Sequence, residues 1–151
     1  MAPGVLEALS AASRQTLSAE NLLPLDQTDT LFAAYSDAFQ KCSAGEKAHV
    51  YLRTAPAESR AVFSRLEHMG AGLRDRHVLL FNRDFLYTGA VKVPARPFFT
   101  AAEALLRLEV DDLRAASWDG SQGLLVDSLE RENELELWCW GDEWLALAGN
   151  G

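Results

Sequence analysis

The sequence predicts a single α+β domain over residues 1–151, with N-terminal helices packed on one face of a mainly antiparallel sheet. The sheet is expected to end in a C-terminal β-meander. Apolar residues recur at helical spacing early in the chain and at period two in its last third. Strands and helices do not alternate regularly, which excludes a doubly wound fold. The length of 151 residues is typical of one domain.

Two helices are expected before residue 45. The first has a sparse apolar stripe, and it ends before Pro24 because proline disfavours helix at the preceding residue. That stripe consists of Val5, Leu6, Leu9 and Leu17. The second helix has Asp26 or Thr28 as its N-cap and ends over residues 43–45. Its apolar positions follow helical spacing: Leu31, Tyr35, Ala38, Phe39 and Cys42.

A strand, a helix and a hairpin are expected in the middle of the chain. Residues 49–53 alternate like a short strand, and Pro56 suits the first turn of the helix that follows. The buried face of that helix has four members: Val62, Phe63, Leu66 and Met69. Residues 77–81 and 85–88 are short and apolar, and they are expected to pair as a hairpin.

Two prolines precede the next expected helix. Pro94 and Pro97 predict that residues 91–97 are extended without forming a central strand. Thr100 and Glu103 then have the spacing of a capping box, which predicts that a helix begins there.

The last third is expected to form four strands. They cover residues 113–118, 124–129, 134–140 and 143–147. Gly141 and Asp142 suit a type II′ turn between the last two, since this turn needs glycine at its first position. Alternation then places Trp144 on an apolar core face with Leu135, Leu137, Cys139 and Ala146. The other face is mixed, with Glu134, Glu136, Trp138, Trp140, Glu143, Leu145 and Leu147.

This mixed face has two interpretations. In the first, helices or another strand cover its tryptophans while the glutamates lie at the rim, because large aromatic residues are mostly buried. In the second, it is a partly exposed aromatic patch in an acidic surround, which is typical of a protein-contact surface.

The negative charge of the chain is concentrated at its C-terminal end. Residues 119–151 contain one arginine and eight carboxylates, which is −7 of the formal net charge of −8. This charge argues against nucleic acid as a ligand, since phosphate binding needs a basic surface.

No motif for chemistry stands out. Cys42 and Cys139 are expected on buried faces, and the three histidines have no ligand spacing, so neither a metal nor a cofactor is expected. An enzyme would need residues that are scattered in sequence, for instance His77, Asp111 and Asp112.

The sequence indicates a cytoplasmic bacterial protein. Its N-terminus lacks the basic and apolar regions of a secretory signal, and its longest apolar runs are too short to span a membrane.

Non-enzymatic binding of a basic protein partner is the function that these observations favour. Small acidic α+β proteins without motifs are found among bacterial immunity proteins and phage inhibitors, and the expected role is to cover a cationic groove. The expected partner-binding residues are Glu134, Glu136, Trp138, Trp140, Asp142 and Glu143. One alternative is a homodimeric adaptor or secretion chaperone that pairs through the same sheet, and another is the small enzyme named above.

Overall fold

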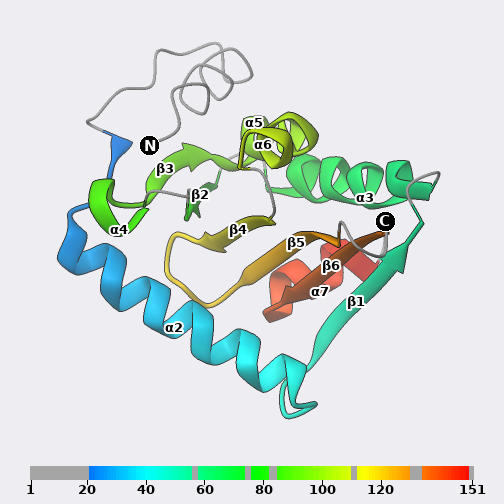
Figure 1. The fold of residues 1–151 in the computed structure, drawn as a ribbon, viewed down its shortest axis with the longest axis horizontal. Coiled ribbons are helices and arrows are strands. Elements are labelled where there is room, and N and C mark those ends of the chain that lie inside the picture. Colours follow the sequence, from blue (N-terminus) through cyan, green and yellow to red (C-terminus); the bar gives the residue numbers. More distant parts are fainter. Residues whose placement is uncertain are drawn as a thin grey trace.

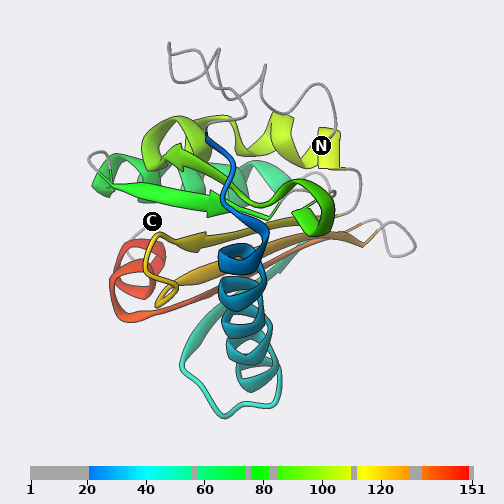
Figure 2. The ribbon, with the colours of Figure 1, turned by 90° about the vertical axis from the view of Figure 1, so that its left-hand side faces the viewer.

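The computed structural model describes residues 21–55, 58–73, 76–81, 85–109, 112–129 and 134–149. These residues form a six-stranded antiparallel sheet with helices on both faces (Figure 1, Figure 2). The α+β class and the antiparallel sheet are therefore confirmed, whereas the helices are not confined to one face. The helix expected from the stripe that begins at Val5 lies outside the described residues.

The sheet has the strand order β1-β6-β5-β4-β2-β3. The strands are β1 (His49–Thr54), β2 (His77–Leu80), β3 (Val91–Pro94), β4 (Asp112–Ser117), β5 (Gly123–Leu129) and β6 (Glu134–Trp140). The last three are neighbours in chain order, which confirms the C-terminal meander. At the two edges lie β1, which pairs with β6, and β3, which pairs with β2.

Helices cover the two faces of the sheet unequally. They are α2 (Leu25–Ser43), α3 (Ser59–Gly72), α4 (Phe85–Thr88), α5 (Ala95–Thr100), α6 (Ala102–Glu109) and α7 (Asp142–Gly149). Figure 2 shows α2 on the side of the sheet opposite to α3, α5 and α6. None of the described helices combines the length and the apolar character that crossing a bilayer requires.

The larger core lies between the sheet and α3. The four residues predicted for the buried face of this helix are all buried, and they meet strand residues such as Leu113, Leu124 and Leu137. Leu135 and Cys139 join this core, as the alternation along residues 134–140 predicts. Trp144 is also buried here, although it reaches the core from a helix.

The smaller core lies under α2. Tyr35, Phe81, Phe85 and Trp140 are buried in it, and the Tyr35 hydroxyl donates a 2.7 Å hydrogen bond to the carbonyl oxygen of Leu124. Burial of this phenol raises its pKa. Trp140 is on the face predicted to be mixed, and α2 covers it.

Two segments predicted to be strands are helices. Residues 85–88 form α4, and β2 pairs with β3 instead, so the extension expected over residues 91–97 ends at Pro94. Residues 142–149 form α7, which follows β6 without a hairpin. Gly141 does have the expected positive φ of 96°, but the amide of Leu145 donates to its carbonyl oxygen and closes the first turn of α7. The periodicity of a short apolar segment fits both a strand and a helix, so tertiary packing decides which of the two it forms.

Neither Asp26 nor Thr28 caps α2, which begins earlier, after Pro24, without a side-chain cap. Thr28 is instead fully buried, and its Oγ1 accepts a 3.0 Å hydrogen bond from the amide of Ala90. The neighbouring amide of Leu23 donates to the carbonyl oxygen of Ala90. The start of α2 is thus attached to the segment that leads into β3.

Thr28→Val is expected to lower the free energy of unfolding by about 1–3 kcal/mol, because the shape is kept while the buried amide of Ala90 loses its acceptor. Urea denaturation of the two proteins measures this difference. Thr30→Val serves as the control, since the Thr30 hydroxyl is exposed and bonds only within its own helix. Equal losses in both variants would contradict the role assigned to Thr28.

Candidate functional site

Three carboxylates lie directly opposite one another across three strands. Asp112 of β4 is paired with Asp127 of β5, and Asp127 is paired with Glu136 of β6. Arg53 of β1 ends the row, opposite Glu136. Like charges in directly opposed positions of a sheet are destabilising, so this row is unfavourable for folding alone.

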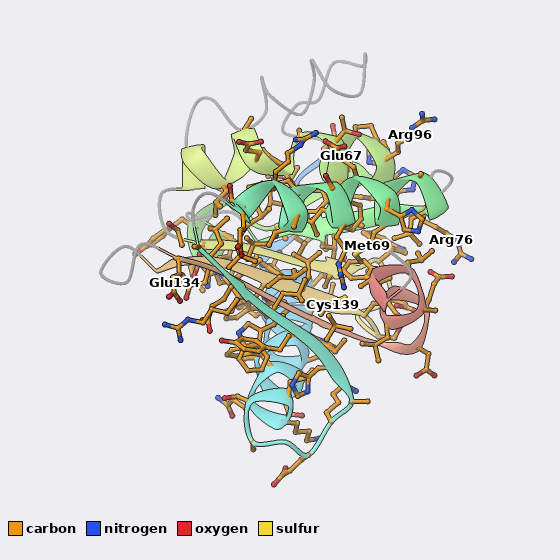
Figure 3. All side chains as sticks on the ribbon, turned by 90° about the vertical axis from the view of Figure 1, so that its right-hand side faces the viewer. Glu67, Met69, Arg76, Arg96, Glu134 and Cys139 are labelled. Carbon is orange, nitrogen blue, oxygen red and sulfur yellow. The ribbon has the colours of Figure 1, made fainter. Side chains whose placement is uncertain are left out.

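Glu134 extends the row into what we call the acidic patch, which consists of Asp112, Asp127, Glu134 and Glu136. All four are on the sheet face that α2 covers only in part, and Figure 3 shows Glu134 at one end of the sheet. Among the described residues, two arginines, Arg53 and Arg114, lie beside these four carboxylates.

The two arginines and a tyrosine contact the acidic patch. Arg53 forms an ion pair with Glu134, and Arg114 Nε lies 3.4 Å from an oxygen of Asp112. The Tyr51 hydroxyl donates a hydrogen bond to Glu136, which raises the pKa of this tyrosine because the charged acceptor favours the protonated phenol. Tyr51 is nevertheless 40% exposed.

The two tryptophans predicted for the partner surface lie in different environments. Trp138 is half-buried at the edge of the area covered by α2, with its ring 4.5 Å from Tyr51 and 5.3 Å from Phe39 between centroids. Trp140 is only 1% exposed, and its ring lies 5.1 Å from that of Tyr35. Of the two, Trp138 is therefore the one that a partner can reach.

Asp142 and Glu143 lie apart from the acidic patch. Both are exposed in the first turn of α7, at the opposite end of β6 from Glu134. Carboxylates in a first turn interact favourably with the helix dipole, which gives these two a structural role. The six residues predicted to bind a partner are therefore not one surface, because the acidic members lie at the two opposite ends of β6.

Of the residues considered for an enzyme, His77 and Asp112 are not brought together. His77 begins β2, and Val78 beside it pairs with Ser117 at the far end of β4 from Asp112. Asp111 lies outside the described residues. Both thiols are buried, which raises the pKa of Cys42 and raises that of Cys139 to about 12. Protonated thiols of this kind are poor nucleophiles.

A polar hollow at the other end of the sheet was not predicted from the sequence. It has a volume of about 620 Å³, and its lining includes Arg76, His77, Lys92, Trp118 and Asp119. A second hollow of about 410 Å³, beside α2, shares Trp118 as a wall. The only sequence signal for this region is that Trp118 directly precedes a turn at residues 119–121.

Asp119 holds that turn in place. One oxygen, Oδ1, accepts hydrogen bonds from the Ser117 hydroxyl at 2.7 Å, the Ser121 amide at 3.0 Å and the Ser121 hydroxyl at 2.7 Å. Hydrogen bonds to the charged form lower the pKa of this carboxyl from 3.8 to about 2.

Asp119→Asn is expected to cost about 1 kcal/mol of stability at pH 7, an amount already reduced for the exposure of this carboxylate. A lowered pKa stabilises the folded state above the ordinary value of 3.8, and the contribution is lost as the pH falls towards about 2. The two proteins should therefore become equally stable in urea titrations as the pH is lowered through this range. A difference that persists unchanged at low pH would contradict this assignment.

The fold and site define an α+β chain with an acidic patch on a partly open sheet face and a polar hollow at the other end of the sheet. No family model matches this sequence, and no curated protein or solved structure matches it either. Among the described residues, no group of three or more His, Cys, Asp or Glu side chains is placed to hold a metal ion.

Proposed function

We propose that this chain is a non-enzymatic binding protein of the bacterial or phage inhibitor or immunity type, and that its acidic patch covers a basic region of a partner protein. The observation that carries the proposal is the row of Asp112, Asp127 and Glu136 in directly opposed positions. Such a row reduces the stability of the chain alone. Arginines or lysines of a partner would relieve this repulsion, so the same charges favour binding.

The surroundings of the acidic patch support this function. Tyr51 and Trp138 adjoin it, and aromatic side chains of this kind are frequent anchors at the centre of protein interfaces. Charged groups around them steer a partner of opposite sign and speed its association, more so at low salt. The patch thus combines a means of attraction with a means of anchorage.

The test compares two double charge reversals in capture of a basic partner from the native cell extract. Glu134→Lys with Glu136→Lys changes the acidic patch. Glu67→Lys with Glu103→Lys makes the same change in net charge at exposed positions on α3 and α6, on the other face. We expect the wild type and the second variant to capture the same basic protein at low salt, and the first variant to lose at least about tenfold in affinity.

Two results would contradict the proposal. Equal loss in both variants would mean that only the net charge matters. Unchanged affinity in the first variant, at low and at high salt, would mean that the acidic patch is not the contact. Circular dichroism of each variant confirms that the fold is retained.

A homodimeric adaptor or secretion chaperone is the second candidate, and the open edge of β1 favours it. Among the described residues, β1 pairs only with β6, and Figure 3 shows its outer side facing the viewer. If two copies of β1 paired antiparallel about Leu52, Tyr51 of one copy would lie opposite Arg53 of the other. Light scattering decides between the candidates, since a monomer at high concentration eliminates the dimer.

A further inference from the structure

The polar hollow lies apart from the acidic patch and is built from separate parts of the chain. Arg76 directly precedes β2 and His77 begins it, Lys92 comes from β3, and Trp118 and Asp119 come from the turn after β4. Figure 3 shows Arg76 and Glu134 towards opposite ends of the sheet. The volume of about 620 Å³ falls within the range of small-molecule sites.

Trp118 is the most informative residue of the hollow. It is 46% exposed, although a side chain of this size is usually buried. The Lys92 ammonium lies 3.9 Å from the centroid of its ring, so a cation and an open aromatic surface occur together. Their position at the wall of a hollow distinguishes this tryptophan from a scattered surface residue.

The walls are held in place before any ligand arrives. Three hydrogen bonds to Asp119 hold the turn that carries Trp118, and Gln122 Oε1 accepts a 3.1 Å hydrogen bond from the amide of Trp144. The turn is thereby attached to the start of α7. A Cβ on Gly141 would lie 2.8 Å from the backbone Cα of Gln122, so this close approach requires glycine. A preformed site loses less entropy when it binds.

The cations of the hollow are weakly engaged. Arg76 Nη2 lies 3.4 Å from Glu143 Oε2, and the side chains of Arg76 and Glu143 are 67% and 42% exposed. Exposed ion pairs and exposed cation–π contacts contribute little, so an incoming anion can replace them. The three hydrogen bonds to Asp119 Oδ1 already engage this carboxylate within its turn.

We propose that the hollow binds a small anion that carries a flat ring, with the ring stacked on Trp118 and the anionic group held by Lys92 and Arg76. Mononucleotides and aromatic carboxylates share this chemistry. A flat ring gains stacking energy on an open tryptophan, and a phosphate or carboxylate gains charge-assisted hydrogen bonds from the two cations. This site is independent of the acidic patch and of the partner proposed for it.

The test is calorimetric titration of the full chain with adenosine monophosphate, naphthoate, neutral adenosine and inorganic phosphate. Binding is expected for adenosine monophosphate, naphthoate or both. The tighter of the two shows whether the natural ligand is a mononucleotide or an aromatic carboxylate. Trp118→Ala should weaken the affinity for this ligand by about tenfold or more, which is the usual loss for a stacked ring. Lys92→Gln should weaken it by about fivefold and leave adenosine unchanged.

Lys41→Gln removes the same charge from an ion pair with Asp37 on α2, outside the hollow, and should bind like the wild type. The variant with Glu134→Lys and Glu136→Lys should also bind like the wild type, which separates this proposal from the previous one. The proposal is overturned if neither adenosine monophosphate nor naphthoate binds with a dissociation constant below about 10 mM. It is equally overturned if Trp118→Ala and Lys92→Gln both bind as the wild type does.

Discussion

Trp140→Ala is expected to lower the free energy of unfolding by about 3–5 kcal/mol, the range for removal of a large buried aromatic side chain. Trp140 is 1% exposed and lies between the sheet and α2, against Tyr35. Beneath it, Gly123 leaves the space that the ring fills, since a Cβ there would lie 2.3 Å from a ring carbon. Alanine therefore opens a cavity in the smaller core. Urea denaturation measures the loss.

Trp118→Ala is the matched control for this prediction. The same side chain is removed, but Trp118 is 46% exposed and belongs to neither of the two cores that the described residues form. Its loss is expected to change stability by less than about 1 kcal/mol. A loss at Trp140 as small as the loss at Trp118 would mean that α2 does not pack over Trp140. The comparison also shows whether Trp118 is available for binding experiments without a stability defect.

Gly89→Ala is expected to cost about 3 kcal/mol or more, because strain and a steric clash add together. Gly89 has a φ of 88°, and a Cβ there would lie 2.0 Å from the carbonyl oxygen of Leu23. A backbone atom cannot move aside as the end of a flexible side chain can. The hydrogen bond from the Leu23 amide to Ala90 would be pushed apart, which loosens the start of α2.

Gly45→Ala separates the two contributions. Gly45 has a similar φ of 78°, but nothing lies within 4 Å of a Cβ at this position. Its replacement should cost only the strain of a left-handed residue, about 1–2 kcal/mol. Thermal denaturation of both variants gives the difference that the clash at residue 89 contributes. If Gly45→Ala is as damaging as Gly89→Ala, the contact with Leu23 has no energetic weight.

Local pattern was sufficient for much of the fold because burial on one side leaves a period in the sequence. The face of α3 with Val62 and Leu66, and the alternation of Leu135, Leu137 and Cys139, are both found in the larger core as predicted. The same alternation placed Trp138 and Trp140 on the opposite face. Counting the charged residues was also sufficient to place the negative charge in the last third of the chain.

The candidate site depends on information that is not local. Asp127 and Glu136 become neighbours through strand register, and Tyr51 joins them from a strand about 80 residues earlier in the chain. A shift of one residue in that register would separate them, and no single sequence reveals it. The hollow at Trp118 likewise combines β2, β3, the turn after β4 and α7.

By itself, therefore, the sequence determined the α+β class, the meander, the core faces of α3 and β6, and the acidic character of the last third. Only the tertiary structure decided that residues 85–88 and 142–149 are helices and that α2 covers Trp140. It also decided that Glu134 and Glu143 lie at opposite ends of β6. The physical reason is that the apolar pattern of a short segment is compatible with both a strand and a helix. Contacts with distant residues then select between them.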